Sequence, residues 1–202
     1  ENNLYEGSFQ PINNDPFWLG HLKKFQINED GTVGTMVWDA GTILQSRDAG
    51  TRNIKTCLGG SLVDFTMDNV SNAVLEAASD TERQAIIGFV RGESAYNTEN
   101  WKLGDVFRST PITIGTPSAF YYDMQDTSNA FTQFRADHIR SSANGKRIIL
   151  AGANDGQMHA FMTSTGAEAW SFIPPNLLSK LKNIAHYDHP TSLTHQYFVD
   201  GP

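Results

Sequence analysis

Three histidines near the end of the chain are residues of the type that binds a transition metal. His186 and His189 lie three positions apart, and His195 follows six residues later. Imidazole suits zinc or copper, and residues at i and i+3 share one face of a helix. Pro190 follows at once, however, and disfavours a regular helix there. A metal site at His186, His189 and His195 is therefore the weaker interpretation, and a hydrogen-bonded structural role is favoured for His195.

His159 is the second candidate for chemistry, and it has apolar neighbours on both sides in a predicted strand. A buried, hydrogen-bonded histidine is favoured there over a catalytic base. The sequence has neither a Gly-x-Ser-x-Gly nucleophile elbow nor a Gly-x-x-x-x-Gly-Lys-Ser/Thr phosphate loop. Its single cysteine, Cys57, excludes an intrachain disulfide and a thiolate zinc cluster. We expect no catalytic residue, cofactor or metal in this chain.

Composition excludes two further classes of partner. The 202 residues carry a formal net charge of −7, and the only basic runs are two short lysine pairs, at 23–24 and 180–182. A nucleic-acid-binding protein normally shows a basic patch, so no nucleic-acid partner is expected. No stretch approaches the ~18 consecutive apolar residues of a membrane span. The chain begins on Glu1 instead of Met, and we expect further sequence upstream.

The elements that must position these residues are mostly β strands. Asn28 to Gly31 is a hairpin turn signal between extended stretches. Helical spacing and the capping-box pattern Ser79-x-x-Glu82 predict a helical insertion at about 67–91. Further strands are expected around Leu103–Val106, Pro111–Ile114 and Gln196–Val199, and a helical turn around Ala136–Ser142.

The region from Arg147 to Phe172 carries the strongest fold signal. Strands at 147–151, 158–162 and 168–172 are joined by turns at Asn154-Asp155-Gly156 and Ser164-Thr165-Gly166. Three antiparallel strands joined by glycine turns make most of a propeller blade. The fold class expected is mainly β: a partial β-propeller with antiparallel blades and short helical insertions. Residues 1–202 form its N-terminal part, with strands for three or four blades.

The segment Ile149–Trp170 resembles the repeat of quinoprotein-type propellers. In that repeat a strand, an Asn-Asp-Gly turn, a His-Ala strand, a Thr-Gly turn and a packing tryptophan recur from blade to blade. The matching positions here are Asn154, Asp155, Gly156, His159, Gly166 and Trp170. The resemblance therefore gives these residues a structural role. Met162 departs from the pattern, which usually has an aspartate there.

Other stretches resemble the PilY-type (PilC/PilY) family of type IV pilus biogenesis and tip-adhesin proteins. They occur in the family's order and include Trp18–Phe25, Trp38–Leu44, Trp101–Pro111 and Gln196–Gly201. The resemblance implies a role in pilus biogenesis and surface adhesion. It implies minor pilins or the major pilin, and a host or surface ligand, as partners. The implied location is the bacterial cell surface, at the pilus or outer membrane.

The same resemblance places calcium outside this chain. The acidic calcium loop of the family lies in a later blade, beyond Pro202, so no residue here is assigned as a calcium ligand. The remaining blades are expected downstream or in a separate chain, because an open propeller would expose two unpaired sheet edges. For the same reason the 202 residues alone are expected to fold poorly.

Two alternatives to a binding and assembly module remain. A quinone-dependent dehydrogenase has a similar propeller but typically adds a vicinal Cys-Cys pair, and Cys57 stands alone. An outer-membrane assembly scaffold is the other alternative. For a binding module, the polar loop at Tyr121, Tyr122 and Asp123 is the candidate contact surface, since loops on a rigid scaffold carry function.

Overall fold

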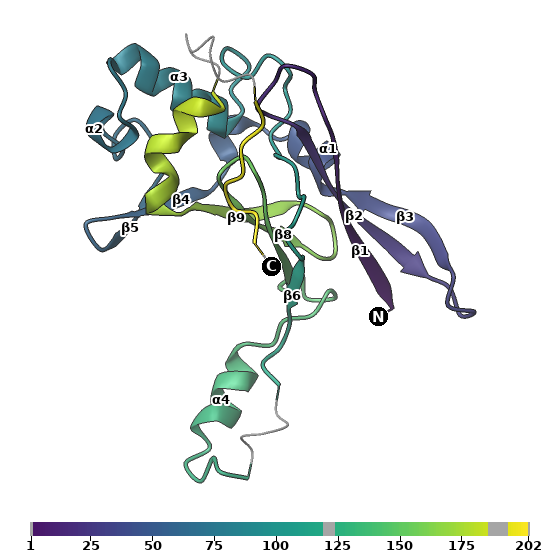
Figure 1. Ribbon diagram of the computed structural model, residues 1–202. Coiled ribbons are helices and arrows are strands. Elements are labelled where there is room, and N and C mark those ends of the chain that lie inside the picture. The colour runs from purple at the N-terminus through teal and green to yellow at the C-terminus, as the bar shows by residue number, and fades with distance from the viewer. Residues whose placement is uncertain (1, 119–123, 186–193, 202) are drawn as a thin grey trace.

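The chain is built on two β-sheets. The computed structural model describes residues 2–118, 124–185 and 194–201. In this part of the chain one sheet has three strands in the order β1-β2-β3, and the other has six in the order β5-β4-β9-β8-β7-β6 (Figure 1). Few helices accompany them, so the expectation of a mainly β protein is confirmed.

The smaller sheet is an antiparallel meander of β1 (Asn3–Gln10), β2 (Leu19–Ile27) and β3 (Val33–Asp39). The predicted turn joins β2 to β3. Gly31 has a φ of 83°, which a residue with a side chain rarely adopts. The side chain of Asp30 accepts a hydrogen bond from the backbone N–H of Thr32 at 3.0 Å. Local turn chemistry thus sets this hairpin.

The larger sheet combines two strand arrangements. β6 (Ile112–Ile114), β7 (Ile148–Gly152), β8 (Met158–Met162) and β9 (Glu168–Ile173) pair antiparallel in chain order. β4 (Ile54–Leu58) pairs parallel with β9 and antiparallel with β5 (Ser61–Asp64). The three strands predicted between Arg147 and Phe172 are therefore present, with β6 as a fourth.

Helical segments fill the connections. They are α1 (Ala40–Gln45), α2 (Asn72–Leu75), α3 (Asp80–Arg91), α4 (Ala130–Asp137) and the 3₁₀ segments η1 (Ala49–Thr51) and η2 (Pro175–Asn183). The predicted cap of α3 is present: Ser79 accepts from the N–H of Glu82 at 3.1 Å. The Glu82 carboxylate accepts from the N–H of Ala78, one residue before the cap.

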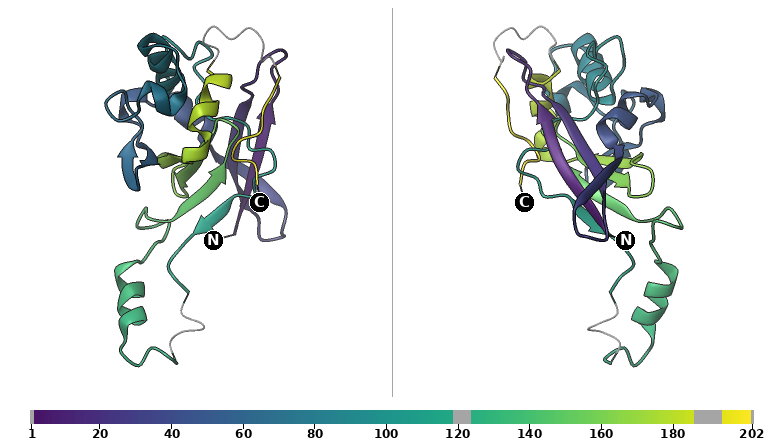
Figure 2. Two further views of the ribbon diagram at one scale, coloured as in Figure 1. Left: turned by 60° about the vertical axis from the view of Figure 1, so that its left-hand side comes forward. Right: turned by 90° about the vertical axis from the view of Figure 1, so that its right-hand side faces the viewer.

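One face of the six-stranded sheet is covered along its central strands β4, β9, β8 and β7. Under β4 and β9, a cluster joins Ile54 and Ile173 to Ile86 of α3 and Leu181 of η2. Under β7 and β8, a second cluster joins Ile149 and Phe161 to the smaller sheet, which crosses these strands in Figure 2; its members from that sheet are Leu22 and Trp38. The helices α2 and α3 lie where an insertion was predicted, and α3 is part of the core.

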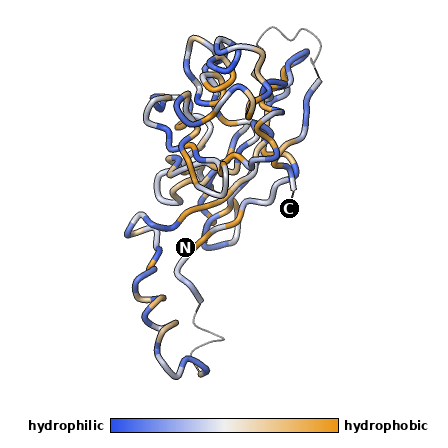
Figure 3. The backbone as a smooth tube through the Cα atoms, turned by 90° about the vertical axis from the view of Figure 1, so that its left-hand side faces the viewer, coloured by the Kyte–Doolittle hydropathy of each residue, from blue (hydrophilic) through white to orange (hydrophobic). Residues whose placement is uncertain are grey.

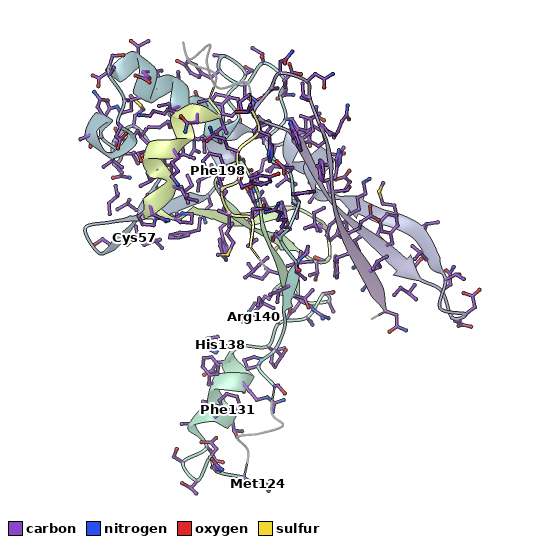
Figure 4. All side chains as sticks on the ribbon, in the orientation of Figure 1. Cys57, Met124, Phe131, His138, Arg140 and Phe198 are labelled. Atoms are coloured by element: carbon purple, nitrogen blue, oxygen red, sulfur yellow. The ribbon has the colours of Figure 1, made fainter. Side chains whose placement is uncertain are left out.

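The connection between β6 and β7 projects from the body as an arm (Figures 1 and 4). Its helix α4 has no buried residue, and the side chain of Met124 is 97% exposed. Figure 4 places Phe131, His138 and Arg140 along this arm. The helix lies at 130–137, which is N-terminal to the helical turn predicted at 136–142.

Two predicted strands are wrong. Gln196–Val199 forms no strand, and the backbone N–H of Phe198 donates to the side chain of Asn154 instead of to a neighbouring strand. Leu103–Val106 contributes only an isolated bridge between Gly104 and Leu19. The described residues form two sheets and no closed propeller, so the propeller and its number of blades stay a prediction. Among these residues no helix is long and apolar enough to cross a membrane.

Candidate functional site

His159 on β8 is the centre of a buried ionic cluster. Its side chain is completely buried, and each ring nitrogen faces a carboxylate: Nδ1 lies 2.9 Å from Oε1 of Glu168, and Nε2 lies 2.9 Å from Oδ2 of Asp155. Burial alone would lower the pKa of His159, but the charges and hydrogen bonds of the two carboxylates outweigh it and raise the pKa to about 9. The histidine is therefore an imidazolium at neutral pH, donating both N–H groups.

Arg52 forms a buried, two-pronged ion pair with the Glu168 carboxylate. Its Nε donates to Oε2 at 3.0 Å and its Nη2 to Oε1 at 2.9 Å, with both side chains fully buried. Nη1 also donates to the carbonyl oxygen of Val90, at the end of α3, at 2.8 Å. Burial of Glu168 would raise the pKa of its carboxyl, but Arg52 and His159 together hold it far below its usual range. Glu168 is thus a carboxylate at any ordinary pH.

Neutral side chains and backbone groups complete this network. Gln157 Oε1 accepts from Ser171 Oγ at 2.8 Å and from Arg52 Nη2 at 3.3 Å. Asp155 Oδ1 accepts from the N–H of Gln157, and its Oδ2 accepts from the N–H of Gly104 at 2.9 Å. A cavity of only about 10 Å³ adjoins Asp155 and Gln157, room for about one water. The cluster's chemistry is therefore internal: it ties strands together and leaves no room for a substrate.

A second cluster lies beside the first, around Asp105. His195 Nε2 lies 2.7 Å from Asp105 Oδ1, and Asn154 Nδ2 donates to Asp105 Oδ2 at 2.8 Å. Burial raises the pKa of Asp105, against the lowering effect of these two partners. Asn154 Oδ1 accepts from the N–H of Phe198 at 2.8 Å, and Trp18 stacks on the His195 ring at 3.9 Å between centroids. This cluster fastens residues 194–201, the C-terminal strap, to the body.

The predicted propeller-motif residues lie in and around these clusters. Asn154, Asp155 and Gly156 form the turn between β7 and β8, and the φ of Gly156 is 85°. Gly166 has a φ of 73°, and a Cβ added there would lie 2.8 Å from Cδ2 of Trp38. Trp170 is half-buried on the opposite face of the sheet.

Of the three histidines of the metal hypothesis, only His195 lies in the described part of the chain. His186 and His189 lie outside the described residues, and His195 is paired with Asp105. Within residues 2–118, 124–185 and 194–201, no group of three or more His, Cys, Asp or Glu side chains is arranged to hold a metal ion. The candidate contact residues Tyr121, Tyr122 and Asp123 also lie outside the described part.

Sequence reasoning missed the charged partners of this site. Arg52, Asp105 and Glu168 were not singled out; Glu168 lies between two alanines in a predicted strand and Asp105 precedes Val106, whereas Arg52 lies between the polar residues Thr51 and Asn53. Arg52 and Glu168 are 116 positions apart. The signal available was the placement of Glu168 at an inward position of a predicted strand, because a buried charge requires a partner.

Several curated proteins of one kind are similar to this chain over most of its length. The chain is 27% identical over 217 residues to the type IV pilus biogenesis factor PilY1 of Pseudomonas aeruginosa strain UCBPP-PA14, covering 98% of the chain and 18% of the relative. It is 28% identical over 221 residues to PilY1 of strain PAK, with the same coverage. A PilY1 homolog of Xylella fastidiosa is 27% identical over 194 residues, 91% of the chain and 15% of the relative.

No family model matches the chain, and no solved structure matches it. The chain spans less than a fifth of the length of these curated relatives. The similarity nevertheless covers 98% of the chain. The chain is thus a homologue of the PilY-type family of type IV pilus biogenesis factors, corresponding to one segment of the longer relatives.

Proposed function

We propose that this chain is a non-enzymatic binding and assembly segment of a type IV pilus-associated protein, acting in pilus biogenesis and surface adhesion. The observation that carries the proposal is the similarity to PilY1 factors over 98% of the chain. The proposed location is the bacterial cell surface, at the pilus or outer membrane. The proposed partners are minor pilins or the major pilin, a host or surface ligand, and the remaining parts of the longer protein.

We propose further that the segment is the first part of a β-propeller. In support, β6 to β9 form a four-stranded antiparallel meander, which is the unit of a propeller blade. The smaller sheet packs on it, and both the Trp38 indole and the Lys24 ammonium donate to the carbonyl of Thr163. β4 and β5 extend the larger sheet beyond a single blade. Any calcium site of the family would lie outside this chain.

The interior of the segment supports binding in preference to catalysis. In the first cluster, the charges of Arg52, His159 and Glu168 are buried and compensate one another. Binding is assigned to the arm, whose described side chains of Phe134 and Ile139 are about half exposed, at 46% and 52%. The contact surface predicted at Tyr121–Asp123 stays a prediction, because these residues lie outside the described part of the chain. A rigid body with a projecting loop suits a module that contacts partners.

Complementation of a deletion strain tests this function. In the bacterium that encodes the chain, the full-length gene should restore surface pili and attachment, and a gene lacking the segment should not. A gene carrying Phe134→Asp and Ile139→Asp should give normal protein levels on immunoblots but reduced pili or attachment, because neither residue lies in the core. Lys182→Met, in an exposed ion pair with Glu76, is the matched control and should behave as wild type. Full pili and attachment without the segment would refute the proposal.

The non-enzymatic part has its own test. The absorbance spectrum of the purified full-length protein should show only aromatic side-chain absorbance. A bound quinone chromophore would overturn this part of the proposal and favour the dehydrogenase alternative.

A further inference from the structure

A hollow of about 680 Å³ opens to solvent between the C-terminal ends of α1 and α3. It is lined by residues 45–50 and 92–94 with Asn100 and Lys102, and is here called the polar hollow. The most apolar stretches of the tube in Figure 3 are strands of the body, whereas the hollow is formed mainly by connections between elements. Among its lining residues only Ala49 has an apolar side chain, so an apolar ligand finds no surface to pack against. The volume lies in the range of about 300–1,000 Å³ that is usual for small-molecule sites.

Internal contacts hold the walls of the polar hollow in place. Arg91 Nη2 donates to the carbonyl of Ala49 at 2.9 Å, and Arg47 Nη2 donates to the carbonyl of Thr51 at 2.6 Å. The aliphatic part of Lys102 runs against Gly92, since a Cβ added to Gly92 would lie 2.4 Å from Cγ of Lys102. Asn100 has a φ of 52°, a backbone conformation that costs energy and is concentrated at functional sites. The polar hollow is therefore preformed.

Lys102 brings a buried positive charge to the polar hollow. The residue is only 4% exposed, and its Nζ donates to the Gln45 carbonyl at 2.6 Å and to Asn100 Oδ1 at 3.5 Å. Burial and the nearby Arg52 lower the pKa of Lys102. An ammonium group has three N–H donors, and within the described part of the chain the third has no acceptor. One donor of a buried ammonium thus remains for a ligand.

Other polar groups around the hollow are also uncommitted. The Glu93 carboxylate and the Ser94 hydroxyl form no hydrogen bond within residues 2–118, 124–185 and 194–201. The same holds for the amide N–H groups of Asn100 and for Oδ2 of Asp48, whose Oδ1 accepts from the N–H of Gly50 at 2.7 Å. The polar hollow therefore offers both donors and acceptors.

The charges of the lining restrict the kind of ligand. Arg47 and Lys102 are positive, Asp48 and Glu93 are negative, and the four charges balance. A metal cation or an inorganic anion would therefore be attracted by one pair and repelled by the other. A hydroxyl group can donate to a carboxylate and accept from an ammonium or amide group. A neutral ligand with several hydroxyl groups satisfies the whole set.

We propose that the polar hollow binds a neutral sugar residue of a surface glycan. Hydroxyl groups of the sugar donate to the carboxylates of Asp48 and Glu93 and accept from the side-chain nitrogens of Asn100 and Lys102. Binding then supplies the acceptor that the buried ammonium lacks. The inference deepens the proposed function and rests on it, because the glycan would be the host or surface ligand of the adhesion role.

Saturation-transfer NMR on the purified full-length protein tests this proposal. The probes are the neutral sugars glucose, galactose, mannose, fucose, N-acetylglucosamine and N-acetylgalactosamine, with glucuronate and zwitterionic glycine as charged probes. At least one neutral sugar should bind. The variant Glu93→Ala with Asn100→Gly should bind that sugar at least tenfold more weakly, because it removes a carboxylate and an amide that contact hydroxyl groups. This variant should fold normally, which its urea midpoint checks, because Glu93 forms no hydrogen bond in the described chain and glycine accepts the positive φ of position 100.

Glu29→Ala with Asn14→Gly is the matched control, because Glu29 is exposed, Asn14 has a φ of 58°, and neither residue lines the hollow. It should bind the sugar as wild type does. The inference is overturned if no neutral sugar binds, if only glucuronate or glycine binds, or if the Glu93 and Asn100 variant binds as well as the control. Surface pili and attachment are scored separately in strains with and without the segment. A negative sugar result beside pili that depend on the segment contradicts this inference and leaves the proposed function standing.

Discussion

Arg52→Met is the most direct test of the buried ionic cluster. The substitution keeps a long, flexible side chain but removes the guanidinium that binds Glu168 through two nitrogens at 3.0 and 2.9 Å. It also removes the donor to the Val90 carbonyl, which links the end of α3 to the sheet. The Glu168 carboxylate then remains buried with two charged partners, His159 at 2.9 Å and the more distant Arg47, whose Nη1 lies 3.8 Å from Oε2.

The expected loss of stability follows from this burial. The Arg52 and Glu168 side chains are both 0% exposed, and removing one partner of a buried ion pair costs about 3–5 kcal/mol. His159 and Arg47 retain part of the compensation for the Glu168 charge, so we expect a loss of about 3 kcal/mol. With a urea m-value of about 2 kcal/mol/M, the unfolding midpoint should fall by about 1.5 M.

Equilibrium urea unfolding followed by tryptophan fluorescence measures this effect at neutral pH. The control is Lys182→Met, whose partner Glu76 is exposed and which should change stability by less than about 1 kcal/mol. The double variant Arg52→Met with Glu168→Gln should recover at least about 1 kcal/mol, because the uncompensated buried charge is gone. An Arg52→Met variant as stable as the control would refute the account of the cluster.

Three further predictions concern the pH dependence of stability, the turn at Gly166 and the C-terminal strap. The free energy of unfolding should fall by on the order of 3 kcal/mol as the pH rises from about 6.5 through 9. The pKa of His159 is about 9 in the folded protein and about 6.5 in the unfolded chain. The stabilisation from His159 is therefore complete below the unfolded pKa and is lost as the pH rises through the folded pKa. A urea midpoint that stays constant from pH 6 to 10 would contradict this. Gly166→Ala should lower the free energy of unfolding by about 1–3 kcal/mol, because the φ of Gly166 is 73° and the new Cβ would collide with the Trp38 ring. An unchanged urea midpoint would show that the turn can relax without loss of stability. His195→Ala removes the bond to Asp105 and should speed hydrogen exchange in residues 194–201 about tenfold; unaltered exchange there would mean that this bond does not fasten the strap.

Features that depend on a few neighbouring residues were predictable from the sequence. The Asn154-Asp155-Gly156 turn needs a glycine with positive φ, and the strand before it, β7, alternates in side-chain burial from Ile148 to Ala151. The start of α3 depends on Ser79 and Glu82, three positions apart. In each case the interacting groups lie within one turn, so their chemistry acts wherever the rest of the chain lies.

Other features were decided only by tertiary packing. Gln196–Val199 has the composition of a strand, but it pairs with no strand, and the side chain of Asn154 accepts the hydrogen bond from the backbone N–H of Phe198. The parallel pairing of β4 with β9 joins residues more than 100 positions apart, and no local pattern specifies it.

The buried ionic cluster around His159 was likewise predictable only in part. Local pattern placed His159 inside a strand, which favoured a buried, hydrogen-bonded histidine from sequence alone. Its charge state depends on Asp155 and Glu168, and that of Glu168 depends on Arg52, which a distant segment brings within 3 Å. Spacing along a chain predicts which groups can share a turn or a face. Only the packed structure decides which buried charges meet, because each must find its partner once water is excluded.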